Sequence, residues 1–457
     1  MLSPRKALFF TAAFCSSLSS VWAADYQPNE VIVKYKEGIV RSRSTMNQIY
    51  NNVGVVKIHR SGLFRGLEHL NLDGNKTVEQ VVSELRQDPT VEYAQPNYIL
   101  RALPIETQAN DTLPVAVNGV PCIFPGIPFP PGCDDGSQPT TRPELKPAPG
   151  EVNPPVADPD LSKAYGLEKV GAPQAWAIHR GDKAFVVADI DTGFDYNHTD
   201  LAGNVWRNPN PSDKSDIAGF DFIHNDGLPY DDNGHGTHTA GTIGAVGGNG
   251  VGISGVIQKV SIMSLKFLSG QGSGTTADAI KAIDYAVAHG AKILSNSWGG
   301  KGDPDNKALG DAIERAKEKD VLFVAAAGND GTDNDGSNPS YPAAFPNDNM
   351  LSVAATNSSD MMASFSNYGK KTTHVGAPGE AVYSLMPGDK YKNLSGTSMA
   401  CPHVAGAAAL LWSYHPKWTY KQVKEVLMKT VDPLPALAEK TVTGGRINVF
   451  KALQSAL

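Results

Sequence analysis

The stretch that decides the fold is Val186-Val-Ala-Asp-Ile-Asp-Thr-Gly193, in which an apolar run ends at Asp191. Two later stretches complete it, and they are Asn233-Gly-His-Gly-Thr-His-Thr-Ala-Gly241 and Ser395-Gly-Thr-Ser-Met-Ala-Cys-Pro-His-Val-Ala-Gly406. They carry His235 and Ser398. A serine hydroxyl becomes a nucleophile only with a base in hydrogen-bond reach, and the base needs an acid that fixes its tautomer. The three stretches therefore predict a catalytic triad in the chain order Asp, His, Ser.

The chain order separates the known frameworks for such a triad. Chymotrypsin-like proteases run His, Asp, Ser and α/β-hydrolases run Ser, Asp, His, whereas subtilisin runs Asp, His, Ser. The run Gly396-Thr-Ser-Met-Ala400 resembles a loose nucleophile elbow, but both histidines after Ser398 precede the next Asp, Asp432. An α/β-hydrolase needs the acid before the histidine, so the order favours the subtilisin framework.

Two other chemistries share parts of these motifs. Asp191-Thr-Gly also marks aspartic proteases, but these need two paired carboxylates, and the sequence has no second Asp-Thr-Gly or Asp-Ser-Gly. His235 and His238 could be metal ligands, yet there is no His-Glu-x-x-His and no obvious third zinc ligand. Neither aspartic nor zinc chemistry is expected.

A fourth feature supplies the remaining part of acyl-transfer chemistry. The run 321–327 predicts a buried strand that opens into a loop at Gly328-Asn329. Acyl transfer needs donors aimed at the developing oxyanion, and the expected donors are Asn329 Nδ2 and the backbone N–H of Ser398 at the start of an apolar helix. An ordinary turn Asn is the alternative for Asn329 alone. Its place between the His and Ser motifs favours the oxyanion role.

Alternating segments after residue 180 predict an α/β fold whose parallel sheet is covered on both faces. The predicted core strands are 185–190, 260–267, 291–296 and 321–327, and the predicted helices are 276–289, 305–319 and 398–413. Sites in such sheets lie beyond the carboxyl ends of the strands. Asp191 and Asn329 fall there, each just past a strand's last apolar residue.

From about Asp158 to the C-terminus the chain resembles the subtilisin-like serine proteases, the subtilases of peptidase family S8, on the thermitase and proteinase K side of that group. The resemblance rests on these motifs and on the run Tyr165-Gly-Leu-Glu-Lys-Val-Gly-Ala-Pro-Gln-Ala-Trp176. It implies a three-layer α/β fold with a mainly parallel central sheet, and a secreted serine endopeptidase of broad specificity that works through an acyl-enzyme. It also implies four roles: orienting acid Asp191, general base and acid His235, nucleophile Ser398 and oxyanion donor Asn329.

The same resemblance implies which residues bind an extended peptide. Two segments match strands that pair with the substrate backbone, and they are Ser297, Trp298 and Gly299, and Gly272, Ser273 and Gly274. Gly299 and Gly328 match small walls of the pocket for the residue before the scissile bond, which implies a roomy apolar pocket. Ordinary turns are the alternative for the glycines.

Calcium is the ion that the resemblance implies, since hard cations take carboxylate, amide and carbonyl oxygens. The matching positions are the side chains of Asp158, Asp200 and Asn249 and the carbonyl groups of Val246, Val251 and Ile253. Asp221 and Asp226 match part of a second site. There, however, Leu228 and Tyr230 stand where oxygen ligands are expected, so the second site is doubtful.

The first residues predict a signal peptide over 1–23, because Arg5 and Lys6 precede an apolar run that ends at Val21-Trp-Ala23, a suitable cleavage spacing. An uncleaved anchor is the alternative. The expected location is therefore extracellular or periplasmic. The net charge of −7 and the lack of a basic stripe argue against a nucleic-acid partner. The chain has 457 residues, 41% of them hydrophobic, and we expect a monomer with no membrane span.

Residues 24–101 predict a small α+β domain, with strands at 30–35 and 91–97 and a helix at 77–86. The domain resembles an inhibitor I9-type prodomain of subtilases. Such a prodomain is the intramolecular chaperone of its protease and then its inhibitor, with its last strand in the active-site cleft. The resemblance therefore implies a zymogen that processes itself.

The proline-rich stretch 102–157 predicts a linker or insertion between the prodomain and a catalytic domain over 158–457. Cys122 and Cys133 lie within it, and in an oxidising exterior they are expected to form a disulfide. The length of this stretch leaves the maturation cut open, either near Arg101 or closer to Asp158.

Two residues near the triad are unusual. Asp189 lies two positions before Asp191, so strand periodicity turns both carboxylates to the same side. Like charges there raise one pKa, and we expect Asp189 to be neutral or paired with a cation. Cys401, three positions after Ser398, is expected to be a buried packing residue, with sensitivity to mercurials as the alternative.

Two rival functions remain open on the sequence. One is a subtilase-like protein that binds peptides without cutting them, which the four intact chemical residues disfavour. The other is a protease restricted to one partner, which the small, uncharged pocket residues disfavour.

Overall fold

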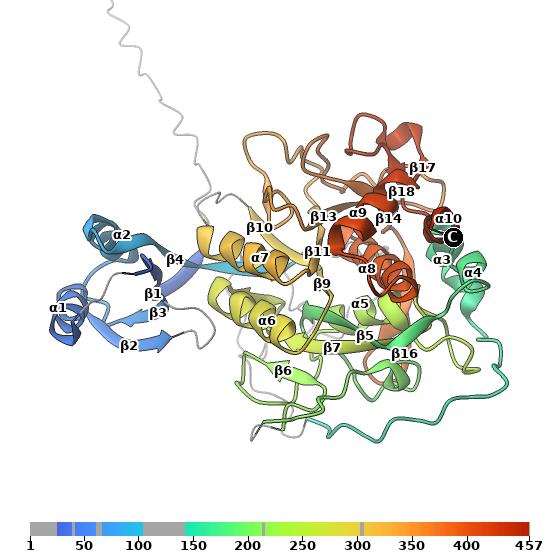
Figure 1. The fold of residues 1–457 in the computed structure, drawn as a ribbon, viewed down its shortest axis with the longest axis horizontal. Coiled ribbons are helices and arrows are strands. Elements are labelled where there is room, and N and C mark those ends of the chain that lie inside the picture. The colour runs from blue at the N-terminus through green and yellow to red at the C-terminus, as the bar shows by residue number, and fades with distance from the viewer. Residues whose placement is uncertain are drawn as a thin grey trace, which may run out of the picture.

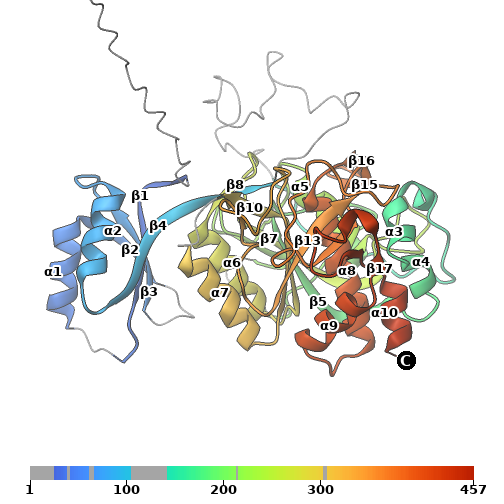
Figure 2. The same ribbon diagram turned by 90° about the horizontal axis from the view of Figure 1, so that it is seen from above.

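The computed structural model describes residues 25–38, 42–60, 66–103, 142–212, 215–301 and 306–456. The predicted signal peptide over 1–23 and the predicted disulfide between Cys122 and Cys133 lie outside these ranges. The described chain forms a small N-terminal domain at one end and a larger C-terminal domain, and strand β4 runs from the first into the second (Figure 1; Figure 2).

The N-terminal domain is an antiparallel sheet with two helices on one face. Its elements are β1 (Tyr26–Tyr35), α1 (Arg43–Val53), β2 (Val55–Arg60), β3 (Leu67–Leu72), α2 (Val78–Gln87) and β4 (Val91–Ala102). β1 lies between β3 and β4, and β2 pairs with β3. Thr77 and Gln80 form a capping box at the start of α2, which buries Val81 and Leu85 against the sheet. The predicted α+β domain is confirmed, and α1, β2 and β3 are additions to its three predicted elements.

The centre of the larger domain is a nine-stranded sheet in the order β17-β18-β14-β13-β11-β9-β5-β7-β6. Its strands are β5 (Gly181–Asp191), β6 (Gly219–Asp221), β7 (Lys259–Lys266), β9 (Ile293–Asn296), β11 (Leu322–Ala326), β13 (Met350–Thr356), β14 (Val375–Pro378), β17 (Asp432–Pro433) and β18 (Gly445–Arg446). All neighbouring strands in this sheet are parallel except the edge strand β17, which is antiparallel to β18. The four predicted core strands are confirmed as β5, β7, β9 and β11. They read as continuous apolar runs because helices cover both faces.

Helices complete the three layers. One face carries α3 (Tyr165–Lys169), α4 (Ala172–Ala175), α5 (His235–Gly244), α8 (Thr397–Tyr414), α9 (Tyr420–Lys429) and α10 (Val449–Ser455), and the other carries α6 (Thr276–Ala288) and α7 (Lys307–Glu318). The predicted helices are confirmed as α6, α7 and α8. α8 is buried from Thr397 to Trp412, which explains why its sequence is apolar all round and rich in alanine.

Five short strands of this domain lie outside its central sheet. They are β8 (Ser273–Thr275), β10 (Trp298–Lys301), β12 (Ser340–Tyr341), β15 (Val382–Met386) and β16 (Lys390–Leu394). β4 of the N-terminal domain pairs with both β8 and β10, so one sheet extends across the two domains. Figure 2 shows β4 entering the larger domain beside β8 and β10.

Candidate active site

Asp191 and His235 form a buried pair at the carboxyl end of the central sheet. Asp191 is the last residue of β5 and His235 is the first of α5, and His235 Nδ1 lies 2.7 Å from Asp191 Oδ1. Both side chains are buried. Burial opposes protonation of the imidazole, but the charge and hydrogen bond of Asp191 outweigh it and raise the pKa of His235. The bond through Nδ1 thus orients the imidazole ring of His235 and leaves its Nε2 able to accept a proton.

Ser398 is the second residue of α8, and its hydroxyl is turned away from the histidine. Ser398 Oγ donates to the carbonyl oxygen of Ser297 at 3.1 Å, while His235 Nε2 has no hydrogen-bond partner within the described residues. The acid–base half of the triad is therefore assembled, and the nucleophile–base bond is not made in this state. Catalytic hydrogen bonds of this kind often form only with substrate in place.

Asn329 is held by Thr397, the residue directly before Ser398. Asn329 Oδ1 accepts from both the backbone N–H and the hydroxyl of Thr397, each at 2.8 Å. These two bonds make Oδ1 the acceptor end of the amide and Nδ2 its donor end. The Thr397 hydroxyl also accepts from Gly328 N at 3.1 Å. Thr397 is not among the residues predicted from the sequence, although its place directly before Ser398 was a signal.

β4 lies between the two segments expected to bind an extended peptide. Arg101 and Leu100 stand opposite Ser273 and Gly274 of β8, and Ala102 and Arg101 stand opposite Trp298 and Gly299 of β10. Ala102 N also donates to Gly272 O at 2.7 Å, and Leu103 N to Ser297 O at 3.4 Å. The structure thus brings both predicted segments onto one peptide, which is the chain's own N-terminal domain.

Leu103 directly follows β4 and is buried. Leu103 lies beside Gly299, since a Cβ added to this glycine would be in ordinary contact with Leu103 Cδ2 at 3.6 Å, while Tyr341 O, at 2.8 Å, is the atom that leaves no room for it. Gly272, with a φ of +73°, would place a Cβ 3.3 Å from Ala102. Gly328 does not contact the strand in this way, since a Cβ there would collide with Asn367 Nδ2 at 2.3 Å. Its role as a pocket wall stays a prediction.

The N-terminal domain also caps two helices of the larger domain. Asn97 Oδ1 accepts from Ala277 N of α6, and Gln95 Oε1 accepts from Ala308 N of α7, both at 2.9 Å. Both side chains are buried. Each satisfies an N–H in the first turn of a helix, where no intrahelical acceptor exists. Sequence reasoning missed this, because the caps come from far along the chain.

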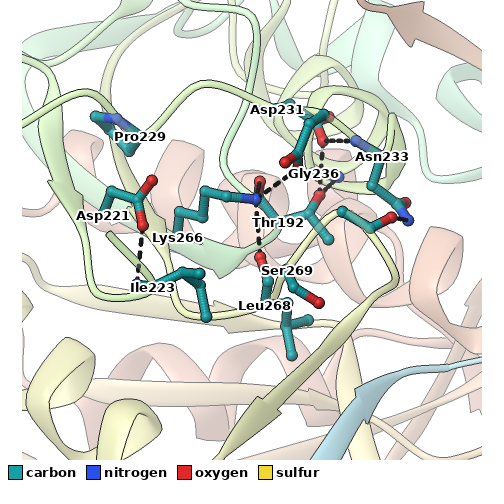
Figure 3. Close-up of polar contacts among 12 residues, drawn as sticks. Thr192, Asp221, Ile223, Pro229, Asp231, Asn233, Gly236, Lys266, Leu268 and Ser269 are labelled. Carbon is teal, nitrogen blue, oxygen red and sulfur yellow. Dashed lines mark hydrogen bonds and ion pairs between the residues drawn. The ribbon is translucent and has the colours of Figure 1, made fainter. Parts of the chain in front are cut away.

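Two buried charged residues hold the loops around the triad, as Figure 3 shows. Asp231 Oδ1 accepts from the Thr192 hydroxyl at 2.9 Å and from Gly234 N at 2.8 Å, which ties the residue after Asp191 to the residue before His235. The fully buried Lys266 ammonium donates to three oxygens, namely Thr192 O (2.8 Å), Leu268 O (2.9 Å) and Asp232 Oδ1 (2.7 Å). Both residues therefore fix the backbone on either side of Asp191 and His235.

Asp189 lies beside the triad on β5 without a cation bonded to it in the described chain. Its Oδ2 accepts from the Thr239 hydroxyl of α5 at 2.8 Å. Burial and the charge of Asp191 raise its pKa well above the ordinary value. Of the two expected states, the neutral carboxyl is the one that the structure favours.

Cys401 and His238 are both buried on the helices that carry Ser398 and His235. Cys401 Sγ lies 3.7 Å from Asn296 O, and burial raises the pKa of its thiol to about 12, so the residue packs as a small apolar side chain. His238 Nε2 lies 3.0 Å from Val382 O, which makes this nitrogen a donor and unsuited to a metal.

The residues expected to hold calcium meet where the chain enters the larger domain. Asp200 Oδ1 lies 2.8 Å from Asn249 Nδ2, and Asp158 Oδ1 accepts from Asn249 N at 3.0 Å. Burial, with the charge of Asp158 added, raises the pKa of Asp200 to about 7. Two buried carboxylates that face only neutral donors fit a cation, which would relieve their repulsion. The described residues include no group of three His, Cys, Asp or Glu side chains suited to a metal, so carbonyl oxygens would be needed.

The fold and this site define the class of protein. Residues 182–448 match the subtilase family, peptidase family S8, and residues 16–97 match the fervidolysin N-terminal prodomain. The chain belongs to the subtilase family and is a serine endopeptidase made as a zymogen with an N-terminal prodomain. Among the helices that the structure describes, none has the length and hydropathy needed to span a bilayer.

Three relatives show the extent of the similarity. Thermitase of Thermoactinomyces vulgaris is 41% identical over 64% of this chain and 96% of its own length. The thermophilic serine proteinase of Bacillus sp. strain AK1 is 32% identical over 94% of this chain and 88% of its own length. Subtilisin E of Bacillus subtilis strain 168 is 37% identical over 59% of this chain and 66% of its own length. The thermophilic serine proteinase thus matches the prodomain as well as the catalytic region.

Proposed function

We propose that Asp191, His235, Ser398 and Asn329 carry out peptide-bond hydrolysis through an acyl-enzyme. The buried bond of 2.7 Å between His235 Nδ1 and Asp191 Oδ1, with Ser398 at a helix start, is the observation that carries this proposal. Ser398 Oγ leaves Ser297 O, bonds to His235 Nε2 and attacks the scissile carbonyl carbon while its proton passes to Nε2. The oxyanion receives hydrogen bonds from Asn329 Nδ2 and the Ser398 N–H.

The second half of the reaction follows from the same groups. The tetrahedral intermediate collapses, the C–N bond breaks, and protonated His235 gives its proton to the leaving amine. Water then enters, loses a proton to His235 Nε2 and attacks the ester, which frees the carboxylate and returns the proton to Ser398. Asp191 keeps the ring in one tautomer and offsets its positive charge in both halves.

Substrates bind as an added strand between β8 and β10. Ser297, Trp298 and Gly299 on one side and Gly272, Ser273 and Gly274 on the other supply the backbone partners, and Gly328 belongs to the pocket wall. Support comes from the pairing of β4 with both strands, because backbone pairing reads little of the side-chain sequence. The place of Leu103 beside Gly299 supports a preference for apolar residues and a broad specificity.

The zymogen is organised as a signal peptide (1–23), a prodomain (24–101), a proline-rich stretch (102–157) and a catalytic domain (158–457). β4 in the groove and the caps on α6 and α7 support both proposed roles of the prodomain, inhibition and assistance in folding. The mature enzyme is secreted and monomeric. Light scattering of the purified enzyme tests the oligomeric state, and its recovery from culture medium or periplasm tests the location.

Calcium binds to Asp158, Asp200 and Asn249 and to the carbonyl oxygens of Val246, Val251 and Ile253. The buried carboxylates of Asp158 and Asp200, which face only neutral donors, support this site. To bind calcium, the Asn249 amide would turn so that its oxygen, and not its nitrogen, faces the ion. Bound calcium would supply charge compensation and fix the loop 246–253. Thermal unfolding of Ser398→Ala protein with and without a chelator tests it, and Asp200→Asn is expected to lose the calcium response.

The deciding experiment is the intact mass of the secreted protein before and after treatment with a fluorophosphonate, with Ser398→Ala in parallel. One phosphonyl group on a shortened chain, absent in the variant, is the expected result. An unlabelled chain that still binds peptides would contradict hydrolysis and favour the peptide-binding alternative.

A further inference from the structure

Arg142 places its guanidinium inside the loop that joins β6 to the catalytic helix. Its Nη1 donates to Asp221 Oδ2 at 2.9 Å, to Asp226 Oδ1 at 3.1 Å and to Leu228 O at 3.0 Å, and its Nη2 donates to Asp226 Oδ2. Asp221 is fully buried, and only 13% of the Arg142 side chain is exposed. The guanidinium is thus enclosed by two carboxylates and a carbonyl group.

These are the acids that the sequence marked as a doubtful second metal site, and they do not fit a metal here. Asp221 Oδ2 also faces His224 Nδ1 at 2.8 Å, and its Oδ1 accepts from Ile223 N at 2.8 Å. The donor positions that a cation would use are therefore taken by N–H groups and by the guanidinium. Arginine matches two carboxylates well, because its planar fork presents several N–H groups at fixed angles.

Arg142 also begins a segment, residues 142–157, that lies along the catalytic domain. The Tyr196 hydroxyl donates to Pro143 O at 2.6 Å, Lys146 N donates to Asn197 Oδ1 at 2.8 Å, and Arg207 donates to Lys146 O at 2.6 Å. Further on, Val156 N bonds to Gly248 O at 2.9 Å. The segment is fixed to the catalytic domain at both of its ends and between them.

We infer that residues 142–157 stay on the active protease as an N-terminal arm, and that Arg142 is the fixed cation that holds the 221–228 loop in place of a metal ion. The maturation cut therefore lies before Arg142, which favours the alternative near Arg101 over the one closer to Asp158. Removing Arg142 would leave Asp221 buried beside Asp226 without its counter-charge, which is strongly unfavourable. This loop leads directly to Asp231, Asp232 and His235, and Figure 3 shows Asp221 and Asp231 on opposite sides of Lys266.

The first test determines where the active protease begins. The fluorophosphonate label identifies the active species, and the intact mass of the labelled chain gives its N-terminus. We expect the labelled chain to begin at Arg142 or upstream of it. A labelled chain that begins downstream of Arg142 would overturn the inference. If no chain is labelled, the proposed catalysis has failed, and the next measurement still decides about the arm.

The second test compares thermal inactivation of Arg142→Gln with that of Arg180→Gln, both in excess calcium. Arg180 is exposed, so its variant removes the same charge without touching the loop. Loss of a buried counter-charge is expected to shorten the half-life of Arg142→Gln about tenfold, while Arg180→Gln behaves as wild type. Equal half-lives would overturn the inference. Should Arg142→Gln not be secreted, thermal unfolding of both variants in the uncut Ser398→Ala protein gives the same comparison.

A double variant separates this contact from a general loss of stability. If Arg142 acts through the loop carboxylates, Asp226→Asn is expected to cost much less in the Arg142→Gln background than in the wild type. Fully additive losses would contradict a direct role of the pair.

Discussion

The backbone N–H of Leu103 and the hydroxyl of Ser398 share one acceptor, since they lie 3.4 Å and 3.1 Å from the carbonyl oxygen of Ser297. The residue that directly follows β4 therefore lies beside Ser398.

This relationship predicts that Leu103 contributes much of the prodomain's affinity. Leu103→Ala in a separately expressed 25–103 chain is expected to raise its inhibition constant about 10- to 100-fold, because burying a leucine is worth about 1.5 to 3 kcal/mol. Val56→Ala is the control, since Val56 is 66% exposed in the same domain. Equal inhibition by the two variants would show that the Leu103 side chain does not fill the pocket.

Asn329 is predicted to act on kcat with little effect on KM. Asn329→Ala is expected to lower kcat about 10²- to 10³-fold, a magnitude carried over from subtilisin, where removal of one oxyanion donor has this effect. Thr397→Val keeps the amide but removes one of its two anchors, so a smaller loss is expected. A change in KM alone, measured with a peptide substrate, would contradict an oxyanion role.

The pair of Asp191 and His235 predicts a shift in the pH profile. The base must be neutral to take the proton, and its pKa is raised by Asp191, so kcat/KM falls as the pH drops through that raised pKa. Asp191→Asn removes the charge and is expected to move this limb to lower pH, together with a loss of about 10⁴-fold in kcat as in the triad of other serine proteases. An unmoved limb would mean that Asp191 does not set the pKa of His235.

Asp189 predicts a gain of stability on substitution. Because its pKa is raised in the folded state, the native protein holds a proton that the unfolded chain releases above about pH 4, so stability falls as the pH rises from there toward the folded-state pKa. Asp189→Asn holds no such proton and is expected to unfold at a higher temperature than the parent at pH 7, with the difference vanishing below about pH 4.

Thermal unfolding of Asp189→Asn and of its parent is compared in the Ser398→Ala background, which prevents autolysis. Asp182→Asn, on the exposed start of the same strand, is the control for the chemical change. A loss of stability at pH 7 in Asp189→Asn would mean that Asp189 is ionised in the native state.

Lys266 is predicted to be essential for stability. Lys266→Met fills a similar volume but leaves Thr192 O, Leu268 O and Asp232 without their shared donor, so a loss of about 3 to 5 kcal/mol in the free energy of unfolding is expected. Denaturant unfolding of Ser398→Ala protein measures it. A loss below about 1 kcal/mol would show that water replaces the ammonium without cost.

The sequence by itself determined the order and identity of the chemical groups. The motifs around Asp191, His235 and Ser398 predicted the α/β framework, because apolar runs of strand length followed by polar groups place those groups at the carboxyl ends of parallel strands. The helices α6, α7 and α8 and the small α+β N-terminal domain followed from the same local patterns. Local periodicity suffices where both faces of an element are covered.

Only the tertiary structure decided which distant groups meet. Nothing local to Arg142 indicates that it faces Asp221, and nothing near Gln95 or Asn97 indicates that they cap helices far along the chain. It also decided that Asp189 faces Thr239, with no cation bonded to it among the described residues. Charge pairing and capping depend on distances through space between segments remote in sequence, whereas strand and helix patterns depend on neighbours along the chain.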